Sequence, residues 1–197
     1  MDNQTFIHSL TKCFNQREAV INNIVNDNGF LENIELICHK IIGCFEAGKK
    51  LIFCGNGGSS SDCQHIASEF VVKLSKDRKA LPAIAITSDN CIITAIANDI
   101  SYNYIFTRQL EAIAYPNDIL VGFSTSGESQ NVIDAIGYAN KNEIITISVT
   151  GNRSNSLMKT ANYKIIIPSQ DTQIIQEVYL MVFHIICENA YNFIAVD

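Results

Sequence analysis

The stretch Leu51-Ile52-Phe53-Cys54-Gly55-Asn56-Gly57-Gly58-Ser59-Ser60-Ser61 decides the fold of this chain. An apolar run enters it, glycines and serines follow, and a helical pattern leaves it, which indicates a buried strand, a tight turn and a new helix. The turn presents backbone N–H groups and hydroxyls to whatever lies above it. His65 and Glu69 follow at a spacing of four, so we expect them on one helix face. This combination favours chemistry on a polar, anionic small molecule.

Four further apolar runs follow along the chain, separated by helical stretches. Each run is almost uninterrupted, as expected for a parallel strand covered on both faces. The sequence therefore predicts an α/β fold with a doubly wound, five-stranded parallel sheet flanked by helices. The predicted strands are Leu51–Phe53, Ala83–Ile86, Ile119–Phe123, Ile144–Val149 and Lys164–Ile167, and the predicted helices between them span 61–74, 89–98, 101–113, 129–141 and 154–160.

Both ends of the chain are predicted to be helical. Residues 1–50 carry apolar side chains at helical spacing, with a turn signal at Asp27-Asn28-Gly29. We expect this N-terminal helical pair to pack on the core or on another subunit. The last segment, from about Asp171 to Ile194, is predicted to be one long amphipathic helix. The sequence shows no internal repeat and no linker rich in Pro and Gly, so we predict one domain over residues 1–197.

The composition excludes several classes of protein. Hydrophobic residues make up 47% of the 197 residues, which argues against a disordered or fibrous chain. The net charge is −6 and no basic stripe is visible, which argues against binding along a nucleic-acid backbone. The protein's overall field repels an anionic substrate, which must therefore be held by local dipoles, hydroxyls or a metal.

The location of the protein is predicted from three further features. No apolar run approaches the ~20 residues that a membrane span requires. The N-terminus, Met1-Asp2-Asn3-Gln4, lacks the basic region of a secretory signal. The seven cysteines include no C-x-x-C pair, and several lie inside apolar runs. We interpret them as buried, reduced thiols of a cytoplasmic protein.

A second hydroxyl-rich loop, Ser124-Thr125-Ser126-Gly127-Glu128-Ser129, precedes the helix predicted near Gln130. Free N–H groups and the positive end of the helix dipole favour a phosphate there. The pattern Thr125-x-x-Glu128 also fits a capping box, which needs no ligand. Ligands of an open α/β sheet bind beyond the carboxyl ends of its strands, where both hydroxyl-rich loops fall. Their shared edge favours the phosphate hypothesis without excluding the cap.

Other candidate residues have ordinary interpretations when each is taken alone. The glycine loop matches neither a Walker A motif nor the G-x-G-x-x-G dinucleotide fingerprint. His65 and Glu69 could be metal ligands, an acid–base pair or a surface ion pair. Gln176 and His184 are eight residues apart, about 12 Å along a helix, so they could meet at one ion only by leaning together or by coming from different subunits.

Four blocks in order resemble the SIS (sugar isomerase) domain and, more closely, the sedoheptulose 7-phosphate isomerases, also called phosphoheptose isomerases. The third block marks SIS domains in general, while the first and fourth together are more specific. The blocks are Gly55-Asn56-Gly57-Gly58-Ser59 with Asp62, Gln64-His65 and Glu69; Ala95-x-x-Asn98-Asp99; Ser124-Thr125-Ser126-Gly127-x-Ser129-x-Asn131-Val132; and Ile167-Pro168-x-x-Asp171-Thr172-x-x-Ile175-Gln176-Glu177 with His184.

The resemblance implies a zinc-dependent aldose–ketose isomerase that forms a homotetramer with sites between subunits. It would convert D-sedoheptulose 7-phosphate to D-glycero-D-manno-heptose 7-phosphate, through an enediol, for lipopolysaccharide or capsule synthesis. The residues implied are Glu69 and His184 for catalysis; Asn56, Gly57, Gly58, Ser59, Glu69, Asn98, Asp99, Ser124, Thr125, Ser126, Ser129, Asp171 and Gln176 for substrate; and His65, Glu69, Gln176 and His184 for one Zn²⁺ per site.

The chain departs from the family pattern at two places. Val72-Lys73 stands where Gly-Arg is common, which puts an anion contact there in doubt because lysine lacks the planar fork of arginine. Glu128 stands where asparagine is frequent, and we expect its carboxylate to point into solvent, away from a phosphate. Two alternatives are a non-catalytic SIS protein of the initiator-associating type and an SIS isomerase for another sugar phosphate. Because Glu69, Gln176 and His184 are all present, the enzyme is favoured over the binding protein.

Overall fold

The structure is a computed structural model that describes residues 3–72 and 79–194, so Lys73 lies outside the described residues. Within them, no helix is both long and apolar enough to cross a membrane. The elements are α1 (Asn3–Val25), α2 (Asn28–Glu46), β1 (Leu51–Gly55), α3 (Gly58–Val71), β2 (Ala83–Ala85), α4 (Asn90–Asp99), the 3₁₀ turn η1 (Tyr102–Tyr104), α5 (Thr107–Ile113), β3 (Ile119–Phe123), α6 (Gln130–Lys141), β4 (Ile145–Gly151), α7 (Ser156–Thr160), β5 (Tyr163–Ile167) and α8 (Thr172–Ile194).

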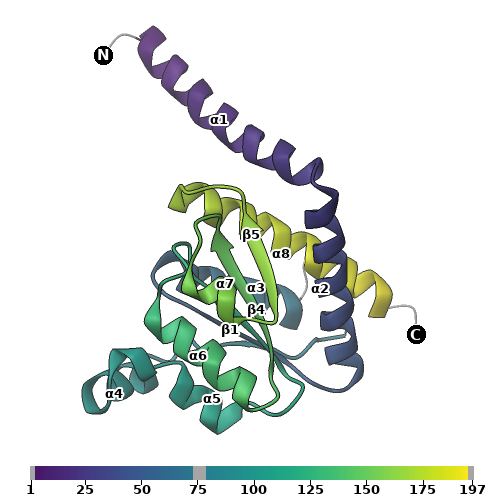
Figure 1. The fold of residues 1–197 in the computed structure, drawn as a ribbon, viewed down its shortest axis with the longest axis vertical. Coiled ribbons are helices and arrows are strands. Elements are labelled where there is room, and N and C mark those ends of the chain that lie inside the picture. The colour runs from purple at the N-terminus through teal and green to yellow at the C-terminus, as the bar shows by residue number, and fades with distance from the viewer. Residues whose placement is uncertain (1–2, 73–78, 195–197) are drawn as a thin grey trace.

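The five strands form one parallel sheet in the order β2-β1-β3-β4-β5, which confirms the predicted fold class. Alternate residues of each strand serve opposite faces. On β1, Leu51 and Phe53 join the core beneath α2, α3 and α8, while Ile52 and Cys54 join the core beneath α4 to α7. Figure 1 shows the helices on the two sides of the sheet.

One predicted helix is divided in the structure. The sequence pattern predicts a helix over 101–113, but this span contains η1 and α5 as separate elements. Ser101 is extended, and its side-chain oxygen accepts a hydrogen bond from the backbone N–H of Asn103. Serine hydroxyls compete in this way with regular helix formation, so a tight turn forms before α5 begins.

Helix α8 packs against α3, and the two helices run in the same direction. An aromatic cluster supports the pair from the sheet, with the rings of Phe123 and Phe183 5.1 Å apart between centroids. The Tyr179 hydroxyl, fully buried on α8, lies 3.0 Å from Ser59 Oγ and 2.5 Å from Asp62 Oδ2. Burial and the hydrogen bond to Asp62 raise the pKa of Tyr179, so the phenol stays protonated and donates to the carboxylate.

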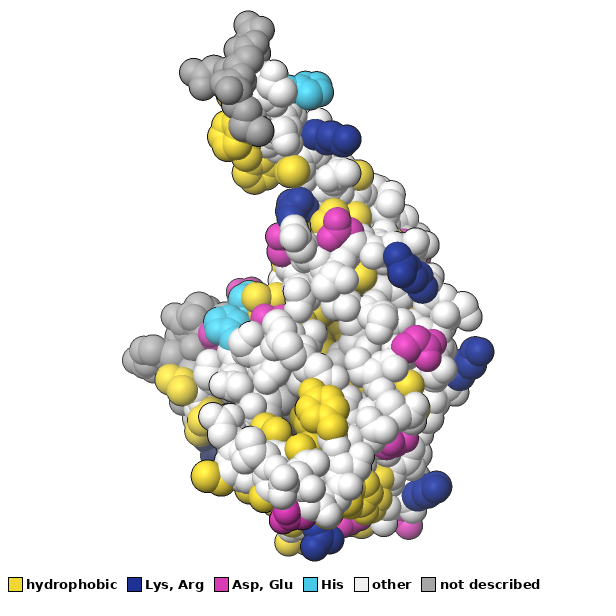
Figure 2. Space-filling model, turned by 90° about the vertical axis from the view of Figure 1, so that its left-hand side faces the viewer, with side chains coloured by type: hydrophobic (Ala, Val, Ile, Leu, Met, Phe, Trp, Pro, Cys, Tyr) yellow, Lys and Arg dark blue, Asp and Glu magenta, His cyan; other side chains and the backbone are white. Residues whose placement is uncertain are grey.

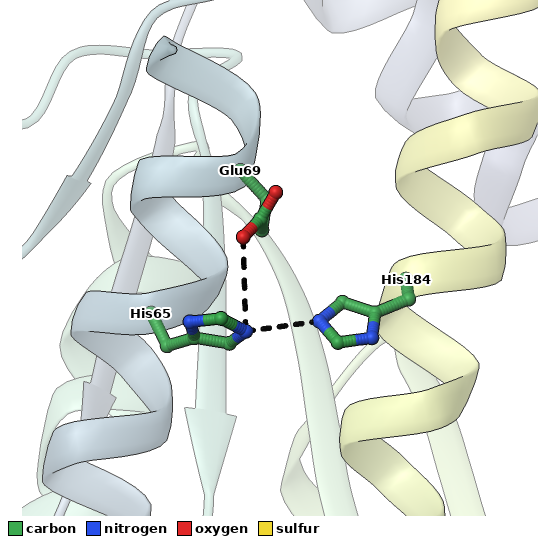
Figure 3. A group of neighbouring side chains, drawn as sticks. All are labelled: His65, Glu69 and His184. Atoms are coloured by element: carbon green, nitrogen blue, oxygen red, sulfur yellow. Dashed lines mark hydrogen bonds and ion pairs between the residues drawn. The ribbon is translucent and has the colours of Figure 1, made fainter. Parts of the chain in front are cut away.

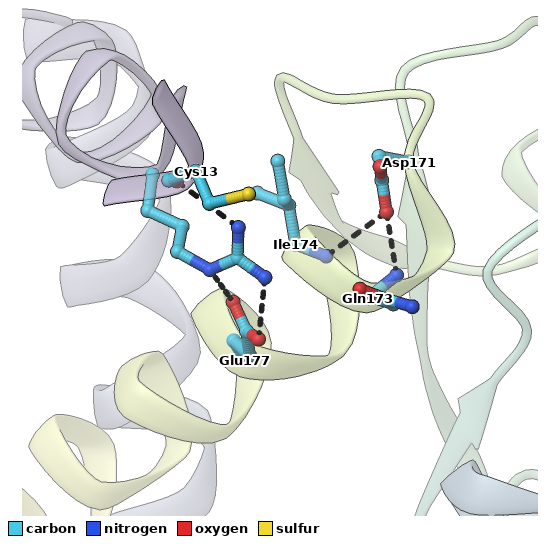
Figure 4. A network of polar contacts seen from close by, with 6 residues as sticks. Cys13, Asp171, Gln173, Ile174 and Glu177 are labelled. Carbon is cyan, nitrogen blue, oxygen red and sulfur yellow. Dashed lines mark hydrogen bonds and ion pairs between the residues drawn. The ribbon is translucent and has the colours of Figure 1, made fainter. Parts of the chain in front are cut away.

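Helix α1 leaves the domain as a projecting arm (Figure 1). Its C-terminal part is held by the core, where Val20 and Ile24 are buried. Arg17 provides a further attachment, because its Nε lies 2.7 Å from Glu177 Oε2 and its Nη2 lies 2.9 Å from Glu177 Oε1. Figure 4 shows Glu177 on α8 beneath α1. This bidentate ion pair attaches the arm to α8, because the planar guanidinium matches the two carboxylate oxygens.

We predict that Tyr179→Phe lowers the free energy of unfolding by about 1–3 kcal/mol, because it leaves the buried Ser59 hydroxyl and the half-buried Asp62 carboxylate without this partner. Urea unfolding at fixed protein concentration measures the change. Tyr115→Phe is the matched control, since the Tyr115 side chain is exposed and should tolerate the same loss of a hydroxyl. Equal stability of the two variants would contradict the role given to Tyr179.

Candidate active site

The candidate site lies where the sheet changes direction of winding. Strands β1 and β3 are neighbours, but the chain proceeds from β1 outward to β2 and from β3 outward to β4. The loops after these two strands therefore diverge and leave a crevice at their carboxyl ends, where open α/β sheets bind ligands. The loop after β1 is the glycine loop, and the loop after β3 is Ser124–Ser129.

His65 and Glu69 from α3 meet His184 from α8 (Figure 3). His65 Nε2 lies 3.0 Å from His184 Nε2 and 3.7 Å from Glu69 Oε1. The parallel packing of α3 and α8 brings these distant parts of the sequence together. One of the two facing imidazole nitrogens must carry a proton and the other must accept it for the 3.0 Å contact to be a hydrogen bond.

The same three side chains fit a metal ion. Their ligand atoms all lie within 4.8 Å of one another. A tetrahedral zinc site with bonds of about 2.0–2.1 Å places neighbouring donors about 3.3–3.4 Å apart. Two of the separations, 3.0 and 3.7 Å, lie on either side of that value, and the third, between Glu69 and His184, is at most 4.8 Å. Side-chain rotations that draw Glu69 and His184 together would complete the geometry. Two imidazoles and a carboxylate are a donor set that suits zinc and other divalent metals.

The loop after β3 gathers serine hydroxyls at the start of α6. Ser124 Oγ lies 2.9 Å from Ser129 Oγ and 3.4 Å from Ser126 Oγ. Ser129 is the N-cap residue of α6, yet its side chain makes no capping hydrogen bond. The hydroxyls and the first turn of a twelve-residue helix thus form a cradle with donors suited to an anion.

The capping-box alternative is wrong for this loop. Glu128 turns to the next helix, where its carboxylate accepts hydrogen bonds from the backbone N–H and the hydroxyl of Ser156 at 2.9 and 2.8 Å. The carboxylate therefore faces the N-terminus of α7, a favourable place for a negative charge. The residue is exposed and turned away from the serine loop, as expected, and Ser156 is a hydrogen-bond partner that the sequence did not reveal.

An amide pair joins the two loops across the crevice. Asn56 Nδ2 donates to Asn131 Oδ1 at 2.8 Å, and Asn131 Nδ2 donates back to Asn56 Oδ1 at 2.9 Å. Asn131 is buried in the first turn of α6, so the pair fixes the glycine loop relative to the serine loop. Asn131 stood in the third sequence block without a role. Asn131 follows β3, the neighbour of β1, so the strand order would have placed it close to Asn56.

A family model described as "SIS domain" matches residues 14–151. The phosphoheptose isomerase of Clostridium acetobutylicum is 44% identical over 165 residues, 84% of each chain, and that of Synechocystis sp. is 42% identical over 183 residues, 92% of this chain and 88% of the relative. The chain belongs to the phosphoheptose isomerase family of SIS-domain proteins. The resemblance inferred from the four sequence blocks is thus confirmed.

Solved structures of this family have the same architecture. The phosphoheptose isomerase from Francisella tularensis superposes with a TM-score of 0.87 at 30% identity, covering 96% of this chain and 98% of that one. The phosphoheptose isomerase from Neisseria gonorrhoeae gives a TM-score of 0.88 at 27% identity, covering 95% and 99%. The prediction from the sequence that this chain is an aldose–ketose isomerase is therefore supported by matches that cover nearly the whole chain.

The remaining predicted residues of this family site occupy several environments. Gly57 and Gly58 are exposed on the glycine loop, whereas Ser59 is buried beneath it against Tyr179. Gln176 lies beside Gly58, since a Cβ atom at that glycine would fall 2.4 Å from Gln176 Nε2. This contact is at the N-terminal end of α3, two helical turns before the histidine pair. Within the described chain the Gln176 amide therefore packs at the glycine loop.

Two more predicted residues of the family site already have local partners. Asn98 and Asp99 end α4, exposed, with Asn98 Nδ2 donating to Asp99 Oδ1 at 2.7 Å. Asp171 precedes α8, and its Oδ1 accepts from the backbone N–H of Gln173 at 2.9 Å (Figure 4). Helix-end roles of this kind are compatible with ligand contacts, because a carboxylate can accept several hydrogen bonds.

A cavity of about 790 Å³ lies elsewhere. It is formed between β2, α4 and α5 and is lined mainly by isoleucine and alanine side chains. Arg108 and Glu111, two of its charged residues, pair with each other at 2.8 Å. None of the predicted catalytic, phosphate or metal residues lines this cavity, so it does not mark the family site.

We predict that one Co²⁺ ion binds per chain, with visible absorption from a site containing imidazole nitrogen. His184→Ala should weaken binding by more than about 100-fold, since even the loss of an outer-shell partner costs 10–100-fold. His39→Ala is the control, because His39 lies on α2 beside Glu35 and away from the cluster. Titration followed by absorbance measures both. Unchanged affinity after His184→Ala would refute the candidate metal site.

Proposed function

We propose that this chain interconverts D-sedoheptulose 7-phosphate and D-glycero-D-manno-heptose 7-phosphate. The observation that carries the proposal is the meeting of His65, Glu69 and His184 in a protein of the phosphoheptose isomerase family. The serine loop supplies a neutral cradle for the phosphate, which suits a chain with a net charge of −6. Alanine in place of any of these groups would remove a donor or base that the reaction needs.

The reaction moves one proton between carbons and one between oxygens. A base takes a proton from C1 of the ketose while the C2 oxygen gains one, which gives an enediol. Proton return to C2 and loss of the O1 proton then give the aldose. The Glu69 carboxylate and the His184 imidazole approach from different helices, so one can act at carbon and the other at oxygen.

Positioning supplies the rest of the catalysis. The Ser124, Thr125, Ser126 and Ser129 hydroxyls would hold the phosphate and thereby set the distance of C1 from the base. His65, Glu69, Gln176 and His184 are the proposed ligands of Zn²⁺, which when bound polarises the carbonyl and stabilises charge on oxygen. Because Gln176 lies two turns from His184, its share in this site requires either a leaning side chain or a neighbouring subunit.

We also propose a homotetramer. The N-terminal half of α1 carries Phe6, Leu10 and Phe14 at a spacing of four, and all three are exposed. Figure 2 shows apolar side chains on this projecting arm. An apolar stripe on an unsupported helix is unfavourable in water, so contact with other copies of the chain would stabilise it.

The wider biological setting is proposed from the same family. We place the enzyme in the cytoplasm as one SIS domain over residues 1–197. Its product would supply heptose for lipopolysaccharide or capsule. These proposals rest on the family and on the sequence features given above.

The catalytic proposal predicts that purified protein converts sedoheptulose 7-phosphate to the aldose and that a chelator abolishes the conversion. Glu69→Gln and His184→Ala should each lower kcat by at least about 10³-fold, as expected for lost proton transfer. His39→Ala serves as the control, and circular dichroism verifies folding. A metal-replete wild-type protein that forms no aldose would favour a non-catalytic SIS protein, and product from another ketose phosphate would favour a different substrate.

The assembly proposal predicts that Phe14→Asp lowers the molar mass measured by light scattering during size-exclusion chromatography. A buried carboxylate in an apolar contact is costly, so the tetramer should dissociate at micromolar concentration. Lys12→Glu changes an exposed residue on another face of the same helix and should leave the mass unchanged. A tetramer that survives Phe14→Asp would place the contact elsewhere.

A further inference from the structure

Tyr102 lies at the rim of the candidate site, although it comes from neither the glycine loop nor the serine loop. It opens η1, which packs against α4 and α6. Its side chain is 55% exposed, yet its hydroxyl donates to Asn56 Oδ1 at 3.0 Å. A half-exposed aromatic ring is therefore held over the end of β1, with its polar tip directed at the loop that the family pattern assigns to substrate.

The hydrogen bonds of Asn56 use both of its acceptor lone pairs and only one of its two donor hydrogens within the described residues. Asn56 Oδ1 has two lone pairs, and both are used, one by Asn131 Nδ2 and one by the Tyr102 hydroxyl. Asn56 Nδ2 has two hydrogens, and one is donated to Asn131 Oδ1. Among the described residues, the second Nδ2 hydrogen has no acceptor and remains as a donor. The Tyr102 oxygen, whose proton is engaged by Asn56, remains as an acceptor.

A donor beside an acceptor is complementary to a hydroxyl group, which both accepts and donates. The phosphate group of a sugar phosphate, as a monoester dianion, offers acceptors alone and could not satisfy the Tyr102 oxygen. We propose that Tyr102, together with Asn56, binds a hydroxyl group on the carbon chain of the substrate. This assignment deepens the proposed function, on which it rests, by making Tyr102 a substrate-contact residue that favours polyhydroxylated sugar phosphates.

The rest of η1 provides the contrast. Tyr104 lies two residues later on the same turn, and its hydroxyl bonds to the Glu111 carboxylate on α5 instead. Removing that hydroxyl alters the same turn without altering the Asn56 contact. The two tyrosines thus separate a ligand contact from a general effect on the local fold.

The test compares Tyr102→Phe with Tyr104→Phe. Calorimetry measures the Kd of sedoheptulose 7-phosphate and, separately, of inorganic phosphate. Tyr102→Phe should raise the sugar phosphate Kd by about 3–10-fold, the range for one hydrogen bond, with the Kd of inorganic phosphate unchanged. Tyr104→Phe should change neither. In turnover assays KM should rise for Tyr102→Phe while kcat stays within about twofold, because the contact does not involve the reacting atoms.

Two results would overturn the assignment of Tyr102 as a substrate contact. An unchanged sugar phosphate Kd in Tyr102→Phe means that the hydroxyl is not a ligand contact. Parallel losses for sugar phosphate and inorganic phosphate mean that Tyr102 supports the loops without touching the carbon chain. The Kd and the product are measured in separate experiments, so a wild-type protein that binds the sugar phosphate but does not isomerise it would contradict the proposed function and leave this test of Tyr102 intact.

Discussion

The register of α3 against α8 is the constraint on which the rest of the site depends. Contacts between the two helices advance together, from Gly58 with Gln176, through Asp62 with Tyr179, to His65 with His184. A slip of one residue would move one helix by 1.5 Å and turn its side chains by about 100°. Such a slip would separate the two imidazoles. The buried Tyr179 hydroxyl therefore does more than satisfy Asp62, because its contacts with α3 are made in the same register that brings the two imidazoles together.

The glycine loop connects this helix pair to the sheet. A Cβ atom at Gly55 would lie 3.0 Å from the Ser59 Cβ and 3.2 Å from the Phe123 Cβ, so the strand end and the first turn of α3 approach as closely as glycine permits. Gly57 has a positive φ of 57°, which glycine adopts without strain. The loop is thus compact for reasons of packing as well as ligand access. Sequence alone could not separate these two demands.

Much of the fold follows from the sequence because each strand is a short apolar run and each crossover is helical. The pattern was less informative where side chains compete with the backbone, as at Ser101, which divides the helix predicted over 101–113. His65 and Glu69 were suspected from their spacing, but His184 lies 119 residues after His65, and their meeting depends on how α3 and α8 pack. Periodicity gives the buried face of a helix and leaves open which neighbour it meets.

The serine loop illustrates a second limit of sequence reasoning. Thr125-x-x-Glu128 has the spacing of a cap, yet Glu128 serves Ser156 across 28 residues. Two demands are met at once, since the carboxylate leaves the serine cradle and its charge is stabilised at the start of α7. Glu128, an acidic residue poorly suited to a phosphate loop, is therefore accommodated by Ser156, a partner that no local sequence pattern reveals.

The Asn56–Asn131 pair completes this picture of a site assembled from separate halves. Parallel topology sends α3 and α6 to opposite faces of the sheet, so no helix packing joins the loops that precede them. Two reciprocal amide hydrogen bonds make the connection instead, at the point where the winding reverses. Amides are well suited to this place, because they carry no charge to repel or neutralise an anion and still retain one N–H for a ligand. The pair that joins the two halves of the crevice therefore adds no charge beside the serine cradle.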